Sequence, residues 1–433
     1  MAAIQEGIKL VGVGKAGSKD CPAGLVAEIV RELRQGDVAP VARTVFFTGL
    51  FLKELNADEA PLAELLPAGA LAGVGALIDE LAPGMPERIR TLTLKILGAD
   101  ILDVAESRMV GDYLFSPESP DVCRALIATA LRIRHAETDE YAGIIEAIHA
   151  VIDPFYDSVT HSKSRSPFKE SKPLVQLAEP FDGVNHSHLL TFALAGHLTG
   201  NGWKVLSIAG ENPGPKQGIN VLDLARDLDV PMLRPDMDAV FDLCSDGGVN
   251  SKVPMKKKWG WCLNTADLSP RFAEWTTLRR QMIKRPFLAT VEKLINPLRA
   301  DVLLSSIYHP TFKGRLGDIA HRAGFKASVV AFRSVEGGLG LSLARASNVT
   351  CTLSCSDGSV IEEKFVFHPA EFGFEHEKDQ KLEAVSAAGD AAKTIKFLES
   401  GSSGDTSFDQ RLKFTLAVYG RAFEWLSEHW HLA

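Results

Sequence analysis

The chain has 433 residues, of which 45% are hydrophobic and 24% charged, and its 47 Lys and Arg against 55 Asp and Glu give a formal net charge of -8. These values are ordinary for a folded globular protein and exclude a disordered chain, a collagen-like chain and a small disulfide-stapled scaffold. The length allows about two or three domains, and the mild acidity disfavours a surface that is basic throughout, while a local basic patch stays open.

No membrane span is expected, because the longest nearly uncharged stretch, residues 65–78, is broken by proline and glycines and is shorter than the roughly 20 residues that a crossing helix needs. Residues 1–9 carry charge early and lack an apolar core followed by a cleavage site, so we expect no secretory signal and a cytoplasmic location. The six cysteines form no CxxC pair, which favours reduced and mostly buried thiols.

The first part of the chain is predicted to be helical. Asp20 and Pro22 stand where an N-cap region and a first turn belong, and Gly36 ends the apolar stripe that follows. Further segments with helical spacing are 40–55, 62–81, 89–105, 121–135 and 141–152. Such stripes are typical of a helical bundle and predict a helical small domain over residues 1–156.

Residues 157–173 are polar and basic, which suits an exposed hinge between domains. From residue 174 to 433, short apolar runs alternate with helical patterns. The predicted strands are 203–208, 259–263, 302–307 and 327–332, and the predicted helices are 187–197, 221–228, 269–283, 314–323, 382–398 and 406–426. This alternation predicts an α/β domain with a mostly parallel sheet flanked by helices. The Asp-Gly at 357–358 between β-branched runs predicts an antiparallel hairpin near the C-terminus.

The loops after strands carry the candidate binding residues, since parallel sheets bind ligands beyond the carboxyl ends of their strands. In the first loop, Gly183 would let a ligand approach, and Asn185 or Ser187 would cap or donate at the start of the next helix. The alternative is a plain turn with an N-cap. A second loop, 209–218, holds Gly210 and Lys216 and is either a phosphate cradle or a long turn.

A third loop, 334–340, contains Glu336 among glycines, and this carboxylate is a candidate ligand for a divalent cation such as Mg²⁺. The pair Cys351 and Cys355 is better explained by core packing than by zinc. The histidines His186, His188, His429 and His431 are expected on the solvated surface.

The triple lysine 256–258, followed by Trp259 and Trp261, combines charge with aromatic surface. With Lys163, Arg165, Lys169 and Lys172 it would form a track for nucleic acid. The alternative is a solvated turn that enters a strand whose tryptophans belong to the core.

Several stretches occur in an order found in one known family. They are residues 14–20 and 46–50, then 278–282, 285–287 and 292–297, then 307–310, the loop at 336–338, the Asp-Gly hairpin, 369–373 and 397–401. In this order the chain resembles anthranilate phosphoribosyltransferase and its relatives in glycosyltransferase family 3, which include the pyrimidine nucleoside phosphorylases. The resemblance covers most of the chain and leaves residues 62–156 as an additional helical region without an assigned role.

The resemblance implies a phosphoribosyl diphosphate site between a helical and an α/β domain, a homodimer formed through the helical domain, and Arg279 as the arginine that binds the acceptor's carboxylate. Three motifs depart from the family pattern. Residues 180–183 replace a Gly-Thr-Gly-Gly-Asp loop, 208–212 replace Lys-His-Gly-Asn-Arg, and 336–340 replace the Asp-Gly-Leu-Asp-Glu that binds magnesium. In addition, 268–270 replace the usual His-His-Pro, so anthranilate is not the expected acceptor.

The hypothesis from the sequence is a divergent glycosyl or phosphoribosyl transferase-like protein that binds a sugar phosphate or nucleotide-like anion. Lys216 would replace the missing cations, and transfer of a pentosyl group would follow. The alternative is a family member without catalysis that binds nucleic acid through the basic segments around Lys163 and residues 256–258.

Overall fold

The structure is a computed structural model that describes residues 2–14, 17–152, 173–234, 259–308, 312, 314–374 and 378–433. The chain divides into two compact units. The first consists of Met1–Val151, Pro213–Pro215 and Glu274–Glu292, and the second consists of Ile152–Asn212, Lys216–Ala273 and Lys293–Ala433. The predicted hinge lies almost wholly outside the described residues, as do lysines 256–258, so the domain limits and the basic track stay predictions.

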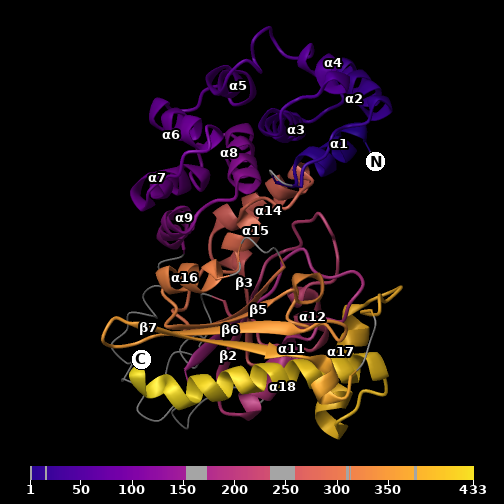
Figure 1. Cartoon of the computed structure of the whole chain (residues 1–433), viewed down its shortest axis with the longest axis vertical. Helices are drawn as coiled ribbons and strands as arrows, with labels where there is room; N and C mark the ends of the chain where they lie inside the picture. Colours follow the sequence, from indigo (N-terminus) through magenta and orange to yellow (C-terminus); the bar gives the residue numbers. More distant parts are fainter. Residues whose placement is uncertain are drawn as a thin grey trace. The chain divides into compact units, whose positions relative to one another are not determined.

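The first unit is helical, as Figure 1 shows in indigo to magenta. Its helices are α1 (Ala3–Val11), α2 (Ala23–Gln35), α3 (Pro40–Lys53), η1 (Ala57–Glu59), α4 (Ala60–Ala63), α5 (Val74–Leu81), α6 (Glu87–Leu97), α7 (Val104–Leu114), α8 (Asp121–Arg134), α9 (Thr138–Ala150) and α15 (Leu288–Val291), with most of α14 (Pro270–Met282). Ile8, Phe46 and Leu126 are fully buried in its core. The predicted helix 62–81 is wrong, because the glycines and proline between residues 67 and 75 separate α4 from α5.

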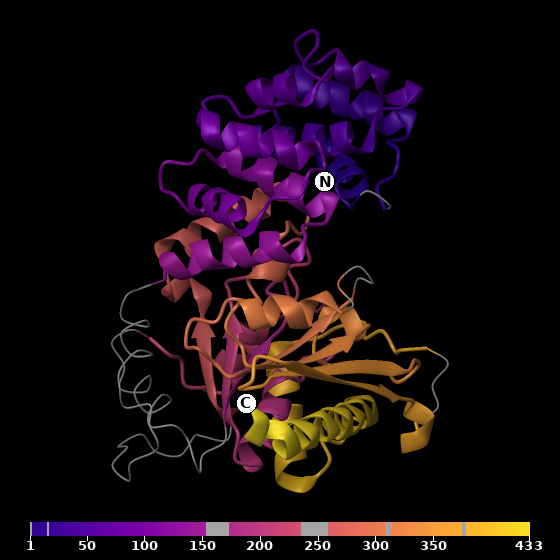
Figure 2. The same cartoon turned by 60° about the vertical axis from the view of Figure 1, so that its left-hand side comes forward.

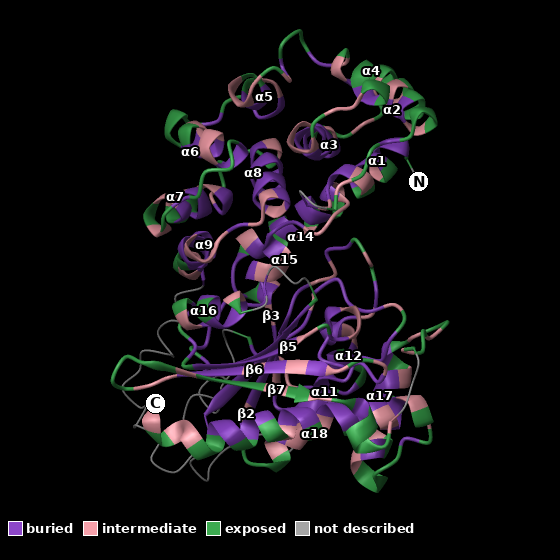
Figure 3. Cartoon of the chain, viewed as in Figure 1, coloured by how far each residue is buried: buried purple, intermediate pink, exposed green. Residues whose placement is uncertain are grey.

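The second unit contains one seven-stranded sheet with the order β3-β2-β1-β4-β5-β6-β7. Its strands are β1 (Leu174–Ala178), β2 (Lys204–Ala209), β3 (Trp261–Asn264), β4 (Val302–Ile307), β5 (Ala327–Phe332), β6 (Ser347–Ser354) and β7 (Val360–Phe367). Neighbours from β3 to β5 pair in parallel, and β5, β6 and β7 pair antiparallel. The predicted fold class and hairpin are confirmed, and Figure 3 shows buried inner strands with an exposed β7 at the edge.

Helices cover this sheet. They are α11 (Thr191–Gly200), α12 (Val221–Asp227), η3 (Thr265–Asp267), α16 (Arg315–Arg322), η5 (Val335–Gly337), η6 (Pro369–Phe372), α17 (Ala387–Ser400), α18 (Thr406–His429) and η7 (Trp430–Leu432). Figure 1 and Figure 2 both show α18 running along the sheet beside β6. Phe414, Tyr419 and Phe423 of α18 are buried in the same apolar cluster as residues of the strands, so this helix packs directly on the sheet. None of the helices described is long and apolar enough to cross a membrane.

Candidate anion-binding site

Three loops meet beyond the carboxyl ends of the strands in the second unit. They follow β1, β2 and β5, and the parallel pairing of β1 with β2, β1 with β4 and β4 with β5 brings those strand ends to one edge of the sheet. This is the edge at which open α/β sheets bind their ligands. The loops hold six of the seven residues that the sequence indicated as site candidates, all except Arg279: Gly183, Asn185, Ser187, Gly210, Lys216 and Glu336.

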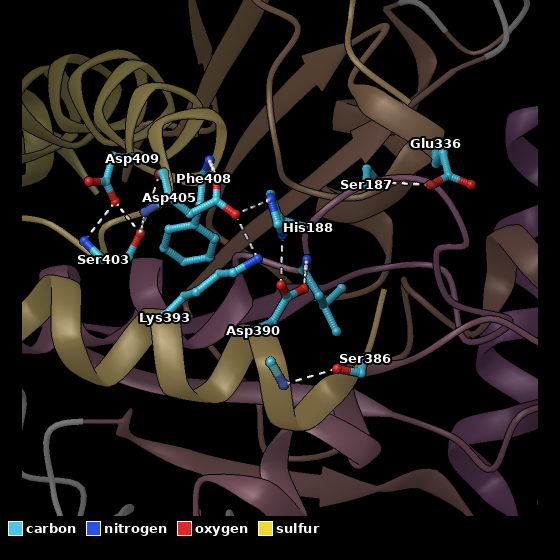
Figure 4. A network of polar contacts seen from close by, with 12 residues as sticks. Ser187, His188, Glu336, Ser386, Asp390, Lys393, Ser403, Asp405, Phe408 and Asp409 are labelled. Atoms are coloured by element: carbon cyan, nitrogen blue, oxygen red, sulfur yellow. Dashed lines mark hydrogen bonds and ion pairs between the residues drawn. The ribbon is translucent and has the colours of Figure 1, made fainter. Parts of the chain in front are cut away.

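The carboxylate of Glu336 is the point on which the three loops converge. The backbone N–H of His186 donates to Oε2 at 2.9 Å, and that of Asn185 lies 3.2 Å from both carboxylate oxygens. The Ser187 hydroxyl donates to Oε2 at 2.8 Å, as Figure 4 shows. The ammonium of Lys216 lies 3.2 Å from Oε1. We call these four donor groups, from Asn185, His186, Ser187 and Lys216, the anion cradle.

Two glycines allow the first and second loops to come together. Val184 and Ile219 exchange backbone hydrogen bonds of 2.9 and 3.1 Å. Gly183 has a φ of +74°, and a Cβ there would lie 2.1 Å from the carbonyl oxygen of Ile219. At Gly218 a Cβ would lie 2.4 Å from the carbonyl oxygen of Val184. The space beside Gly183 therefore holds a neighbouring loop of the protein, and this contact brings Asn185 and Lys216 to the same carboxylate.

The backbone of Glu336 itself has an unusual conformation. Its φ of 52° and ψ of 10° lie in the left-handed region, which is costly for a residue with a side chain and persists only when its surroundings fix it. Lys216 donates to the Glu336 carbonyl at 3.2 Å, and the Ser306 hydroxyl donates to the carbonyl of Gly337 at 2.5 Å. These bonds hold the Glu336 backbone and so aim its carboxylate at the cradle.

The cradle stabilises the charged form of Glu336. Burial raises the pKa of this carboxyl, but the hydrogen bonds from His186, Ser187 and Asn185 and the charge of Lys216 outweigh burial. The pKa of Glu336 is therefore lowered from its ordinary value of 4.5. The carboxylate is an anion bound by the donors that were expected to hold a phosphate.

A second carboxyl group, that of Glu179, lies behind the Glu336 loop and was not selected from the sequence. It is only 2% exposed and accepts a hydrogen bond of 2.6 Å from the Thr191 hydroxyl. Burial raises the pKa of Glu179 to about 7, although the bonds from Thr191 and the Leu339 N–H oppose the shift. A Cβ at Gly338 would lie 2.9 Å from Glu179 Oε2, so the two loops pack closely here as well.

The same first loop is anchored on its other side by His188. Its Nδ1 lies 2.7 Å from Asp390 Oδ1, and the Leu189 N–H donates to Asp390 Oδ2 at 2.8 Å. Figure 4 shows the ring between Asp390 and Asp405, with Nε2 at 3.9 Å from Asp405 Oδ2. The expectation of a solvated His188 is wrong, because the side chain is buried beneath the start of α18, against Phe408. His186 is exposed, as expected.

Gly210 and Arg279 do not donate to the cradle. A Cβ at Gly210 would lie 2.6 Å from the ring of Phe181, so this glycine allows close packing at the end of β2. Arg279 belongs to the first unit, where its guanidinium pairs with Glu292. Its Nε and Nη2 are buried and have no hydrogen-bond partner in the described part of the chain.

The residues around Glu336 do not fit a magnesium ion. Mg²⁺ is held by oxygen ligands in an octahedron, whereas the groups that surround this carboxylate are N–H and O–H donors and an ammonium. Within the described ranges, no group of three or more His, Cys, Asp or Glu side chains is placed to hold a metal ion.

Solved structures with this fold exist. Anthranilate phosphoribosyltransferase from Saccharomyces cerevisiae in complex with PRPP (phosphoribosyl diphosphate) and Mg matches with a TM-score of 0.54 and 13% identity, over 78% of this chain and 90% of that chain. The same enzyme in complex with 4-fluoroanthranilate matches with a TM-score of 0.52 and 13% identity, over 77% of this chain and 88% of that chain. No protein-family model and no curated protein sequence matches the chain. The chain is therefore structurally similar to anthranilate phosphoribosyltransferase over most of its length, as the order of its sequence motifs predicted.

Proposed function

We propose that the second unit binds a phosphorylated small molecule, a sugar phosphate or nucleotide-like anion, at the anion cradle. One observation carries the proposal: Asn185 and Ser187 of the first loop and Lys216 of the second, all candidate phosphate-binding residues from the sequence, converge on one carboxylate. Carboxylate and phosphate oxygens accept the same charge-assisted hydrogen bonds. A cradle that holds a carboxylate is therefore suited to a phosphate group.

The composition of the cradle supports this ligand class. Two successive backbone N–H groups, a hydroxyl and an ammonium face one point, and consecutive N–H groups of this kind form anion-binding concavities in many phosphate sites. The Saccharomyces enzyme of the same fold was solved with PRPP. A phosphorylated pentose is accordingly the first ligand to test.

Transfer of a pentosyl group to an acceptor is the reaction that this ligand class would serve. A leaving diphosphate needs its developing charge neutralised, and Lys216 is the cation of the cradle that would do so. In the proposal Arg279 binds an acidic group on the acceptor, as the family resemblance implies, and two of its nitrogens have no hydrogen-bond partner among the described residues. Gly183 and Gly210 act through loop packing. The homodimer and the cytoplasmic location remain predictions from the sequence.

Titration calorimetry with PRPP, pyrophosphate and inorganic phosphate, each with and without Mg²⁺, tests the proposal. Lys216→Met should weaken binding by roughly 10- to 100-fold, since a hydrogen bond to a charged group contributes about 1.5–3 kcal/mol. Lys364→Met is the matched control, because Lys364 is an exposed lysine of β7 that pairs with Glu362. Absence of binding to all three ligands, or equal loss in both variants, would refute the proposal.

The nucleic-acid hypothesis rests on lysines outside the described residues, and it enters the same experiment as a further ligand. Short single-stranded and duplex DNA should be titrated at two salt concentrations. Binding that falls steeply with salt and is unchanged in Lys216→Met would favour the nucleic-acid hypothesis over the phosphate cradle.

A further inference from the structure

The anion cradle is filled by a group of the protein itself. Glu336 lies 150 residues beyond His186 in the sequence, yet its carboxylate accepts the hydrogen bond of that residue's N–H. Lys216 is bound to the same side chain. The groups proposed to hold a ligand's phosphate are thus already satisfied by a carboxylate in the free protein.

We propose that Glu336 is an internal competitor of the ligand, so that its carboxylate occupies the ligand's anionic position until the ligand displaces it. This inference rests on the proposed function, because the competing ligand is the phosphorylated molecule assigned to the cradle. It adds the requirement that binding must move one named side chain.

The anchoring of the loop determines how Glu336 moves. The Val335 N–H donates to the carbonyl of Gly340 at 2.9 Å, and the carbonyls of Glu336 and Gly337 are held by Lys216 and Ser306. The backbone is therefore fixed at several points. The side chain of Glu336 is 18% exposed, which gives the carboxylate a route to solvent. Displacement then takes place by rotation of the side chain and leaves the loop in position.

Competition by a carboxylate also selects among ligands. A monoanionic carboxylate ligand offers the cradle no more than Glu336 does, whereas a phosphate group carries about -1.5 to -2 charges and three strong acceptor oxygens. Only a ligand that binds better than the tethered carboxylate displaces it, and the measured affinity is the intrinsic affinity multiplied by the fraction of molecules in which Glu336 has left the cradle. Glu336 thus makes the site specific for phosphate over carboxylate.

The test removes the Glu336 carboxylate by substitution and then adds an anion to the solution. In Glu336→Ala the cradle is empty, so inorganic phosphate and acetate should each raise the melting temperature of the variant more than that of the wild-type protein. Glu362→Ala is the matched control, because Glu362 is a carboxylate of the same unit that pairs with an exposed lysine. Glu336→Gln keeps the length of the side chain, and its affinity for phosphate should exceed that of the wild type by roughly 10-fold or more.

The outcomes separate the two proposals. The proposal that Glu336 competes with the ligand would be overturned by either of two results. The first is an equal rise in the melting temperatures of Glu336→Ala and Glu362→Ala with phosphate and acetate, and the second is an unchanged phosphate affinity of Glu336→Gln. If PRPP binds the wild type and Glu336→Gln with the same affinity, the competitor role of Glu336 is likewise rejected, while the proposed function stands. If phosphate and acetate raise the melting temperature of Glu336→Ala but neither the wild type nor any variant binds PRPP or a nucleotide, the competitor role is supported. The proposed ligand class is then rejected.

Discussion

The substitution Gly183→Ala tests whether the two loops must touch for the cradle to form. An alanine there meets two penalties. The left-handed φ of +74° costs an L-residue about 1–2 kcal/mol. The new Cβ would also lie 2.1 Å from the carbonyl oxygen of Ile219, and forcing extra volume into a packed site typically costs about 1–3 kcal/mol. The sum is roughly 2–5 kcal/mol of lost stability.

Gly358→Ala separates these two penalties. Gly358 has a φ of +85° and no heavy atom within 4 Å of the position of a Cβ, so it carries the backbone cost alone. Urea denaturation followed by tryptophan fluorescence should show Gly183→Ala less stable than Gly358→Ala by about 1–3 kcal/mol. Titration of Gly183→Ala with phosphate should show weaker binding, because the shifted loop moves Asn185 and Ser187. Equal stability of the two variants would refute the argument from loop contact.

Three further predictions concern buried or charged groups. Asp390→Ala should cost about 3 kcal/mol in urea denaturation, because His188 and the Leu189 N–H lose a buried acceptor. The pKa of Glu336 is lowered, so its carboxylate should stabilise the fold above pH 4.5. This stabilisation should be lost as the pH falls through the folded-state pKa. The difference in unfolding free energy between the wild type and Glu336→Gln should therefore disappear over that pH range. Glu179 has its pKa raised to about 7 from 4.5, so the folded state retains the proton longer and stability should fall, by on the order of 3 kcal/mol, as pH rises from 4.5 to 7; Glu179→Gln should remove that slope.

Most of the sheet could be predicted from sequence because its strands are bounded by clear turn residues. The central strand β1 was missed. Its run of apolar residues is short and is interrupted by Gln176, whereas the equally buried β4 begins with three consecutive apolar residues. It also follows directly on the basic stretch that ends at residue 172. The hairpin of β6 and β7 was found because Asp-Gly specifies a tight turn by local chemistry alone.

The first loop shows why the site was only partly predictable. A helix was expected from residue 187, but α11 begins at Thr191. The chain stays irregular over this stretch because the N–H of His186 is donated to Glu336 and that of Leu189 to Asp390. These acceptors lie 150 and 201 residues further along the chain, so a reading of local spacing does not reveal them. The same contact buries His188, which local spacing placed at the surface.

Stability and binding at the cradle are expected to oppose one another. Without an anion, the half-buried N–H of Asn185 and the exposed N–H of His186 would exchange the Glu336 carboxylate for water, and the net stabilisation lost is about 0.5–1.5 kcal/mol for each hydrogen bond. Glu336 avoids this loss and neutralises Lys216, and so stabilises the closed form. Glu336→Ala and Lys216→Met should therefore both lower stability, while the first strengthens phosphate binding and the second weakens it. If Glu336 had only a structural role, Glu336→Ala would lower both the stability and the affinity for phosphate. A loss of stability together with a gain in phosphate affinity would therefore distinguish a competitor from a residue that only supports the loop.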